Sequence, residues 1–324
     1  MKTIIARKGK GSKAVLGHLA ALITAIAWGC SFISTKVLME DGGLTPVEVY
    51  VYRFSLAYIL MLLITFKKIL ANNWRDEIQF ALCGVCAGTL YFLTENYALK
   101  YTTTGNVSLL SGISPIFTTI LMAIVYKVRI KNGEIIGSAA AFVGVACVIF
   151  SPSIAQGLGF EINPFGDLLA LSCAVSWAIY SIAIKRLIPL YSTLFITRKL
   201  FFYGVITALP LLFVQEAPTH FAAVFDLSHP QLLINLLFLS LMCSVMAYLF
   251  WNGSMKLIGA VATNNYLYLQ PLVTMVAGYI FFDEKIYLLG YIGCALIIGG
   301  LVMADKLNIG KDKEYIQNAI NLKK

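Results

Sequence analysis

Ten runs of apolar residues, each about 20 residues long, follow one another along this chain of 324 residues. A helix of about 20 residues is long enough to cross the hydrocarbon core of a bilayer. Apolar residues make up 59% of the sequence and charged residues 13%, which leaves too little polar surface to cover a soluble core. The sequence therefore predicts an all-α membrane protein with ten transmembrane helices. The expected spans are 16–38, 47–66, 77–99, 104–126, 133–150, 166–185, 194–214, 232–255, 260–282 and 286–304.

Lys and Arg gather in every second connecting segment. Nineteen of the 25 lie in the termini and loops of one side, and two, Lys100 and Lys285, lie on the other. Positively charged loops stay in the cytoplasm, so we expect both termini there and the chain in the cell inner (plasma) membrane. Although the net charge is +9, the cations form no basic face with interleaved aromatic residues, and no nucleic-acid partner is expected.

Two residue spacings occur in both halves of the sequence. A Trp precedes a Lys by eight residues in the first and sixth runs, and an Asn precedes a Pro by nineteen residues in each half. The pairs are Trp28 and Lys36, Trp177 and Lys185, Asn96 and Pro115, and Asn252 and Pro271. Four coincidences at matching positions argue against chance, although a duplication kept only for helix packing stays open. Because each half has five spans, an odd number, the halves are expected to form two inverted five-helix repeats.

Inverted repeats are common in secondary transporters, where the substrate binds between the repeats near the middle of the membrane. The repeat also suggests how the chain is organised. We expect a basic cytoplasmic N-terminus (1–15), a first repeat (16–150), an external linker (151–165), a second repeat (166–304) and a cytoplasmic tail (305–324).

Short motifs in both halves resemble a known transporter family. They are Ala27-Trp28-Gly29, Tyr52-Arg53-Phe54, Ala98-Leu99-Lys100, Gly166-Asp167-Leu168-Leu169-Ala170, Trp177-Ala178-Ile179-Tyr180, Gln270-Pro271-Leu272 and Asp283-Glu284-Lys285. With them the chain resembles the EamA-type ten-span members of the drug/metabolite transporter superfamily over residues 16–304. The resemblance implies a central cavity between the repeats and transport of small metabolites, often amino acids and often outward. The fourth span departs from the family pattern, because the segment Val125-Tyr126-Lys127-Val128-Arg129 stands where a Glu commonly closes that span.

Three charged residues fall inside predicted spans on the external side: Lys36, Arg53 and Glu95. A charge at the centre of a span costs roughly 2.5–3.5 kcal/mol on insertion scales, so their similar depth predicts an ion-paired intramembrane cluster. Snorkelling to the headgroups is the alternative, especially for Lys36. If protons are the coupling ion, Glu95 is the candidate carrier, because it is the carboxylate placed well inside a span. A structural ion pair between Glu95 and Arg53 is the competing interpretation.

The fourth and ninth spans carry polar residues at helical spacing around a proline. Pro115 and Pro271 are expected helix breaks, because proline frees a carbonyl that a cavity, a side chain or a neighbouring helix must satisfy. Aromatic residues of other spans are expected to line the same cavity. The expected cavity residues are Trp28, Ser108, Ser111, Trp177, Tyr180, Tyr248, Asn264, Tyr266 and Gln270. Hydrogen bonding between helices and purely structural aromatic residues are the alternatives.

No catalytic or metal site is expected. The seven Cys all lie in apolar runs, the three His are scattered, and no metal-binding His or paired Asp motif occurs. We therefore expect neither an enzyme nor a cofactor. The fifth and tenth runs carry glycines at three- and four-residue spacing, which predicts close helix packing and leaves a homodimer open.

These features favour a secondary transporter of small polar metabolites that works by alternating access in the lipid bilayer. The resemblance makes an amino acid or related metabolite the expected small-molecule substrate and export the expected direction. An integral-membrane enzyme is one alternative, but it would need acidic or His residues clustered at one membrane face. A non-transporting receptor or assembly factor is another, but it would need a sizeable soluble domain.

Overall fold

The computed structural model describes residues 2–102, 104–127, 129–130, 132–157, 163–214, 219–226, 228–282 and 285–306. Within these ranges every regular element is a helix. Most of the predicted cytoplasmic tail, beyond residue 306, and the centre of the predicted linker, 158–162, lie outside the described residues. The all-α architecture expected from the sequence is confirmed.

The first half of the chain begins with a long helix and ends with another. Its elements are α1 (Lys2–Glu40), α2 (Pro46–Thr65), α3 (Trp74–Gly84), the π-helical turn η1 (Val85–Leu90), α4 (Tyr91–Tyr101), α5 (Thr104–Ser111), α6 (Ser114–Tyr126) and α7 (Asn132–Ala155). Thr45 and Glu48 form a capping box that starts α2, because Thr45 Oγ1 accepts from the Glu48 amide at 3.2 Å and Glu48 Oε2 accepts from the Thr45 amide at 2.8 Å. Helix α7 continues five residues past the predicted end at 150 and includes Pro152.

The second half repeats this pattern. Its elements are α8 (Pro164–Leu187), α9 (Thr193–Ala208), α10 (Leu211–Val214), the 3-10 turn η2 (Phe221–Phe225), α11 (Pro230–Ser240), the π-helical turn η3 (Leu241–Met246), α12 (Ala247–Ile258), α13 (Ala260–Asn265), the 3-10 turn η4 (Tyr266–Leu269), α14 (Gln270–Phe282) and α15 (Leu288–Lys306). Both prolines predicted as helix breaks lie at the second residue of a new helix, Pro115 in α6 and Pro271 in α14.

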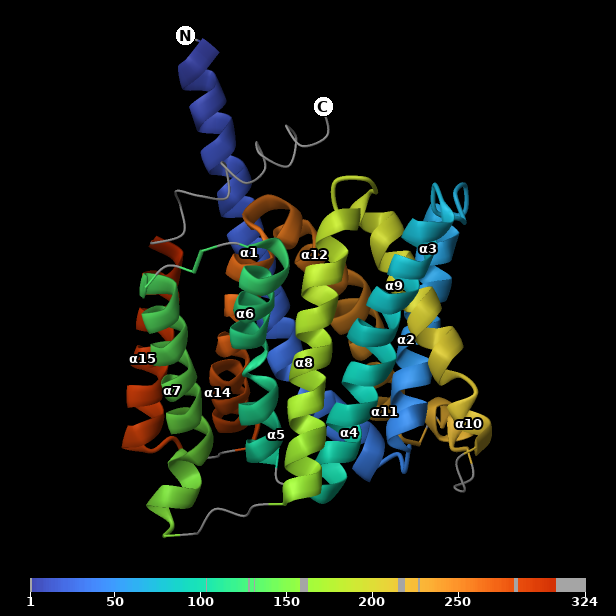
Figure 1. Cartoon of the computed structure of the whole chain (residues 1–324). Helices are drawn as coiled ribbons and strands as arrows, with labels where there is room; N and C mark the ends of the chain where they lie inside the picture. Colours follow the sequence, from blue (N-terminus) through green and yellow to red (C-terminus); the bar gives the residue numbers. More distant parts are fainter. Residues whose placement is uncertain are drawn as a thin grey trace.

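Eight helices of the described residues are long and apolar enough to cross a membrane. The segments 260–282 and 288–306 complete the ten spans. Figure 1 shows α1 running downward from the N-terminus, whereas α8 runs upward from the opposite end of the molecule. The two halves therefore cross the membrane in opposite senses, as the sequence predicts.

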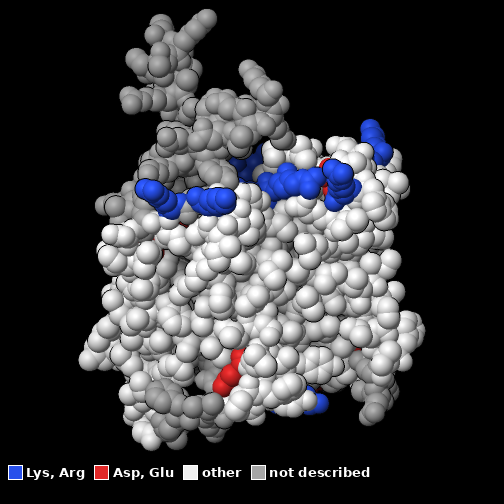
Figure 2. All heavy atoms as spheres, in the orientation of Figure 1, with Lys and Arg blue, Asp and Glu red and all other residues white. Residues whose placement is uncertain are grey.

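Charged side chains lie mainly at the ends of the molecule. On the face shown in Figure 2, Lys and Arg form a belt at the end where α1 begins, and the surface below that belt is almost free of charge. Lys185 and Arg186, for example, lie in the last turn of α8. The uncharged zone between the two ends is the surface that a bilayer covers.

Glycines let α7 and α15 approach until their backbones touch. A Cβ added at Gly137 would lie 2.6 Å from the Gly300 carbonyl oxygen, and one added at Gly144 would lie 2.6 Å from the Gly293 carbonyl oxygen. The predicted glycine packing thus joins two spans of one chain. A homodimer stays a prediction.

We expect Gly300→Val to lower the free energy of unfolding by about 1–3 kcal/mol. A Cβ at Gly300 would lie 2.6 Å from the Ala141 amide nitrogen, which is backbone and cannot move aside cheaply. Its neighbour supplies the matched control, because a Cβ at Gly299 would meet nothing within 4 Å. Thermal unfolding in detergent measures both variants. Equal destabilisation by Gly299→Val and Gly300→Val would contradict the close approach of α7 and α15.

Candidate functional site

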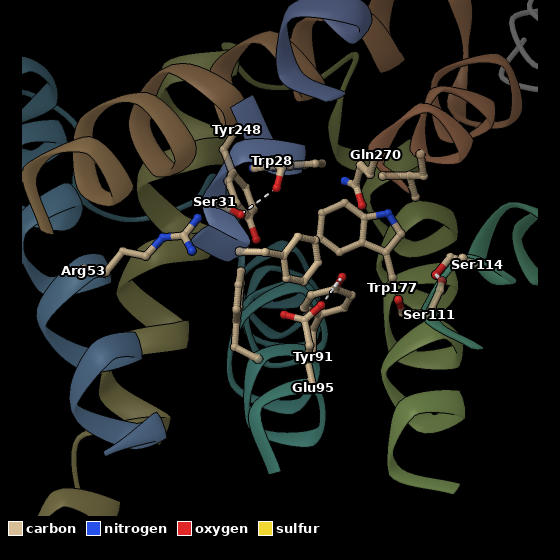
Figure 3. Close-up of a pocket in the computed structure, with 14 residues that line it drawn as sticks. Trp28, Ser31, Arg53, Tyr91, Glu95, Ser111, Ser114, Trp177, Tyr248 and Gln270 are labelled. Carbon is tan, nitrogen blue, oxygen red and sulfur yellow. Dashed lines mark hydrogen bonds between the residues drawn. The ribbon is translucent and has the colours of Figure 1, made fainter. Parts of the chain in front are cut away.

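A cavity lies between helices of both repeats (Figure 3). The space between its walls, open parts included, amounts to about 510 Å³. It is lined by Trp28, Ser31, Phe32, Arg53, Tyr91, Phe92, Glu95, Ser111, Gly112, Ser114, Trp177, Tyr248, Leu267 and Gln270. These residues come from α1, α2, α4, α5, α6, α8, α12, η4 and α14 and from the break between α5 and α6.

The cavity extends from the middle of the spans toward the end of the molecule away from the N-terminus. In α1 the lining begins at Trp28 and continues toward the end of the helix at Glu40. In α2 it includes Arg53, in the half of the helix that begins at Pro46, and in α4 it includes Glu95, in the middle of the helix that ends at Tyr101. All three helix ends lie opposite the belt of Lys and Arg (Figures 1 and 2).

Arg53 provides a positive charge in this cavity. Its side chain is buried, with 4% of its surface exposed. Its Nε donates to Ser244 Oγ at 2.7 Å and its Nη2 donates to the Cys243 carbonyl at 3.0 Å. The guanidinium carbon also lies 5.4 Å and 5.0 Å from the ring centres of Phe54 and Phe92. One edge of the guanidinium is therefore held by the protein.

Glu95 provides a carboxylate in the same cavity. It is 6% exposed, and its Oε1 accepts a hydrogen bond from the Tyr91 hydroxyl at 3.0 Å. Figure 3 shows Glu95 and Arg53 extending toward the cavity from different helices. Among the described residues no ion pair within 4.0 Å joins the two, so the geometry gives no support to the structural ion pair proposed from the sequence.

Lys36 does not join this site, contrary to the predicted three-residue cluster. Its amino group lies 3.8 Å from Glu40 Oε1, and its side chain is 70% exposed. Lys36 and Glu40 are one helical turn apart on α1 and face away from the cavity. The prediction grouped Lys36 with Arg53 because both lie at a similar depth in the membrane. Depth alone does not determine the direction in which a side chain points around its helix axis.

Tryptophan rings form one wall of the cavity. The ring centres of Trp28 and Trp177 lie 5.3 Å apart, and the Trp251 ring lies 4.9 Å from that of Trp28 and 5.9 Å from that of Trp177. We call these three residues the tryptophan cluster. Trp28 Nε1 donates to the Cys243 carbonyl at 2.8 Å and Trp177 Nε1 donates to Asn264 Oδ1 at 3.0 Å. Trp28 and Trp177 line the cavity, whereas Trp251 is fully buried and packs against their rings.

The structure brings five of the nine expected cavity residues to the cavity: Trp28, Ser111, Trp177, Tyr248 and Gln270. Others lie elsewhere. Tyr180 and Asn264 are fully buried behind the tryptophan cluster, where the Tyr180 hydroxyl donates to Asn252 Oδ1 at 2.7 Å. Tyr266 lines a separate apolar space beside α15, and its hydroxyl lies 2.9 Å from His18 Nδ1. The side chain of Ser108 lies outside what the structure describes.

The sequence reasoning missed several lining residues. Ser31 and Tyr91 are the polar ones that matter most here, and each has a signal in the sequence. Ser31 follows Trp28 by three residues and Tyr91 precedes Glu95 by four, the spacings at which helical side chains share a face. Extending each predicted site residue by one helical turn in both directions would have found them.

The chain is similar in sequence to known transporters. The sequence model of the EamA-like transporter family matches residues 15–150 and 164–304. A relative from Clostridium kluyveri named "Uncharacterized transporter" is 26% identical over 292 residues, covering 89% of this chain and 92% of the relative. A relative from Streptantibioticus cattleyicolor named "Probable terminal-alkyne amino-acid exporter" is 25% identical over 306 residues, covering 94% of this chain and 97% of the relative.

A solved crystal structure has a similar fold. It superposes with a TM-score of 0.70 over 92% of this chain and 98% of the solved chain, at 19% sequence identity. At this level of identity the likeness concerns the fold alone.

Proposed function

The chain belongs to the EamA-like transporter family, and we propose that it exports amino acids or closely related zwitterions by alternating access. As a member of this branch of the drug/metabolite transporter superfamily, it is a multi-pass membrane transporter of small molecules and not an enzyme. The proposal concerns the substrate, the direction of transport and the mechanism.

The observation that carries the proposal is a cavity with one buried cation and one buried carboxylate. An α-amino acid offers the complementary charges, a carboxylate for Arg53 and an ammonium group for Glu95. Hydrogen bonds to charged groups each contribute about 1.5–3 kcal/mol, so a ligand that satisfies both residues is favoured over one that satisfies a single residue. The aromatic walls suit the carbon skeleton of such a molecule.

Two further points support this substrate class. The name of the Streptantibioticus cattleyicolor relative assigns amino-acid export to that protein. Ser31, Ser111 and Gln270 add uncharged hydrogen-bonding groups to the cavity, which suit a polar metabolite better than a lipid.

Counterflow in proteoliposomes tests the proposal. The vesicles are loaded with one unlabelled L-amino acid at a time, and uptake of the same labelled amino acid is followed. We expect at least one amino acid to exchange at a rate well above that of protein-free vesicles, and glucose to show no exchange. If no amino acid in the full set exchanges, the substrate assignment is wrong.

The belt of Lys and Arg supports an orientation with both termini in the cytoplasm of the inner membrane. In that orientation the cavity extends from the middle of the membrane toward the outside, with the tryptophan cluster near its inner end. We expect a cysteine at Gly157 to react with an impermeant thiol reagent from outside the cell, and one at Asn72 to react from the cytoplasmic side only. A background without native cysteines is required. Labelling of both positions from one side would contradict the inverted arrangement.

Glu95 is our candidate for a proton carrier. The Tyr91 hydrogen bond holds its carboxyl group at the cavity wall, where a proton and a substrate ammonium group would compete for it. We expect Glu95→Gln to abolish flux driven by a pH gradient while counterflow, which needs no net proton movement, continues with a higher KM, because the substrate ammonium group loses its counter-charge. Unchanged gradient-driven flux in Glu95→Gln would remove Glu95 from coupling.

A further inference from the structure

The two π-helical turns occupy equivalent places in the two repeats. Val85–Leu90 and Leu241–Met246 are 156 residues apart, and the same interval separates Asn96 from Asn252, which the repeat pairs. A π turn inserts one extra residue into a helix, leaves its backbone carbonyls less well paired, and often occurs at functional sites. The turn is therefore a feature of the duplicated fold, and each copy lies next to the cavity.

In the second repeat the π turn supports the cationic end of the site. The hydroxyl of Ser244, which is fully buried, donates to the carbonyl of Leu239 five residues earlier at 3.0 Å. Its proton is thus engaged, and its oxygen accepts from Arg53 Nε at 2.7 Å. The Cys243 carbonyl accepts from Arg53 Nη2 at 3.0 Å and from Trp28 Nε1 at 2.8 Å.

These contacts orient the guanidinium of Arg53. Its Nε and Nη2 are held by the turn, while Nη1 has no hydrogen-bond partner among the described residues. Because Arg53 lines the cavity, the edge that includes Nη1 is left for a ligand. A guanidinium binds a carboxylate best when its planar fork is already fixed.

The first repeat lacks this support. The residue equivalent to Ser244 is Gly88, and a Cβ at that position would lie 2.5 Å from the Tyr50 hydroxyl. A serine side chain therefore fits one π turn and is excluded from the other. Of the two π turns, the one in the second repeat therefore carries the serine that accepts a hydrogen bond from Arg53, and the one in the first repeat carries glycine at the equivalent position.

We propose that Ser244 is a positioning residue that sets Arg53 to receive the carboxylate of the substrate. This inference rests on the proposed recognition of amino acids. It assigns a role in specificity to a residue that lies outside the cavity and acts through Arg53. The same geometry predicts that loss of Ser244 weakens binding of a carboxylate and leaves binding of an uncharged amide unchanged.

The test compares Ser244→Ala with Ser240→Ala. Ser240 is also fully buried, lies one turn earlier and donates to the Leu236 carbonyl at 2.7 Å, but within the described residues no hydrogen bond joins it to Arg53. The probes are the L-amino acid with the fastest counterflow and its carboxamide. We expect Ser244→Ala to raise KM for the acid roughly tenfold, with kcat and the KM of the amide near parent values. Ser240→Ala should leave both KM values unchanged.

A second variant, Ser244→Gly, reproduces the residue of the first π turn and should show the same selective loss. An unchanged ratio of acid to amide KM in both Ser244 variants would overturn the positioning role while leaving amino-acid transport intact. An equal change in Ser240→Ala would also overturn it, because helix packing would then explain the effect. If the parent protein does not prefer the acid over the amide, the proposed carboxylate recognition itself is wrong, and the role of Ser244 is wrong with it.

Discussion

Replacing Glu77 by alanine is expected to lower the free energy of unfolding by about 3–5 kcal/mol. Glu77 lies at the start of α3 and is 8% exposed. Its Oε1 accepts from Lys199 Nζ and from the Tyr203 hydroxyl, the latter at 2.6 Å, and its Oε2 accepts from the Ala71 amide at 2.9 Å. Without Glu77, the ammonium group of Lys199, a residue that is only 3% exposed, loses its counter-charge.

Glu40 provides the matched control for this prediction. It pairs with Lys36 at 3.8 Å, and both side chains are exposed, so Glu40→Ala should cost less than about 1 kcal/mol. Reversible unfolding in mixed detergent micelles measures both variants. The double variant Glu77→Ala with Lys199→Ala should recover part of the loss, because no buried charge is then left unpaired. Similar losses for Glu77→Ala and Glu40→Ala would show that the buried pair adds no stability.

The buried pair also explains how the two repeats are held together near the positive belt. Glu77 belongs to the first repeat, and Lys199 and Tyr203 belong to the second. Close by, Arg186 of α8 lies 3.0 Å from Asp76 Oδ1, and the Tyr191 hydroxyl donates to Asp76 Oδ2 at 2.7 Å. Such contacts close the end of the molecule opposite the cavity.

The ten spans could be predicted from the sequence because the bilayer permits few alternatives. A chain in hydrocarbon must satisfy its backbone hydrogen bonds within each segment, so an apolar run of about 20 residues becomes a helix. The inverted repeat followed from matching residues such as Trp28 and Trp177, and the structure places these two rings in contact.

The sequence does not predict which side chains of each helix point toward the cavity, because this depends on how the helix is rotated about its own axis. Lipid-facing and packed surfaces are both apolar in a membrane, so hydropathy does not reveal which side of a span faces the centre. The sequence therefore predicts Tyr180 and Asn264 in the cavity, although both lie behind it. It also predicts Lys36 in a charged cluster with Arg53 and Glu95, although Lys36 faces outward.

The π turns were also beyond the sequence analysis. One extra residue in a turn changes neither the length nor the composition of an apolar run enough to be noticed. Its effect is to redirect every following side chain by about 100°, one residue's rotation in a helix. Ser244, which accepts from Arg53, lies within such a turn.

The recognition of a carboxylate by Arg53 is tested most directly by Arg53→Gln. The variant removes the fixed charge, so we expect kcat/KM for amino-acid counterflow to fall by about 10–150-fold, which corresponds to about 1.5–3 kcal/mol. Counterflow of the matching carboxamide should change much less. Lys36→Gln is the control, because it removes a cation that lies outside the cavity, and it should leave both rates near parent values.

The decisive quantity is the ratio of acid to amide kcat/KM in parent and Arg53→Gln proteins inserted in equal amounts. We predict that this ratio falls by at least tenfold in Arg53→Gln and is unchanged in Lys36→Gln. A ratio that stays at the parent value in Arg53→Gln would contradict binding of the substrate carboxylate by Arg53, whether both kcat/KM values are retained or both fall by the same factor.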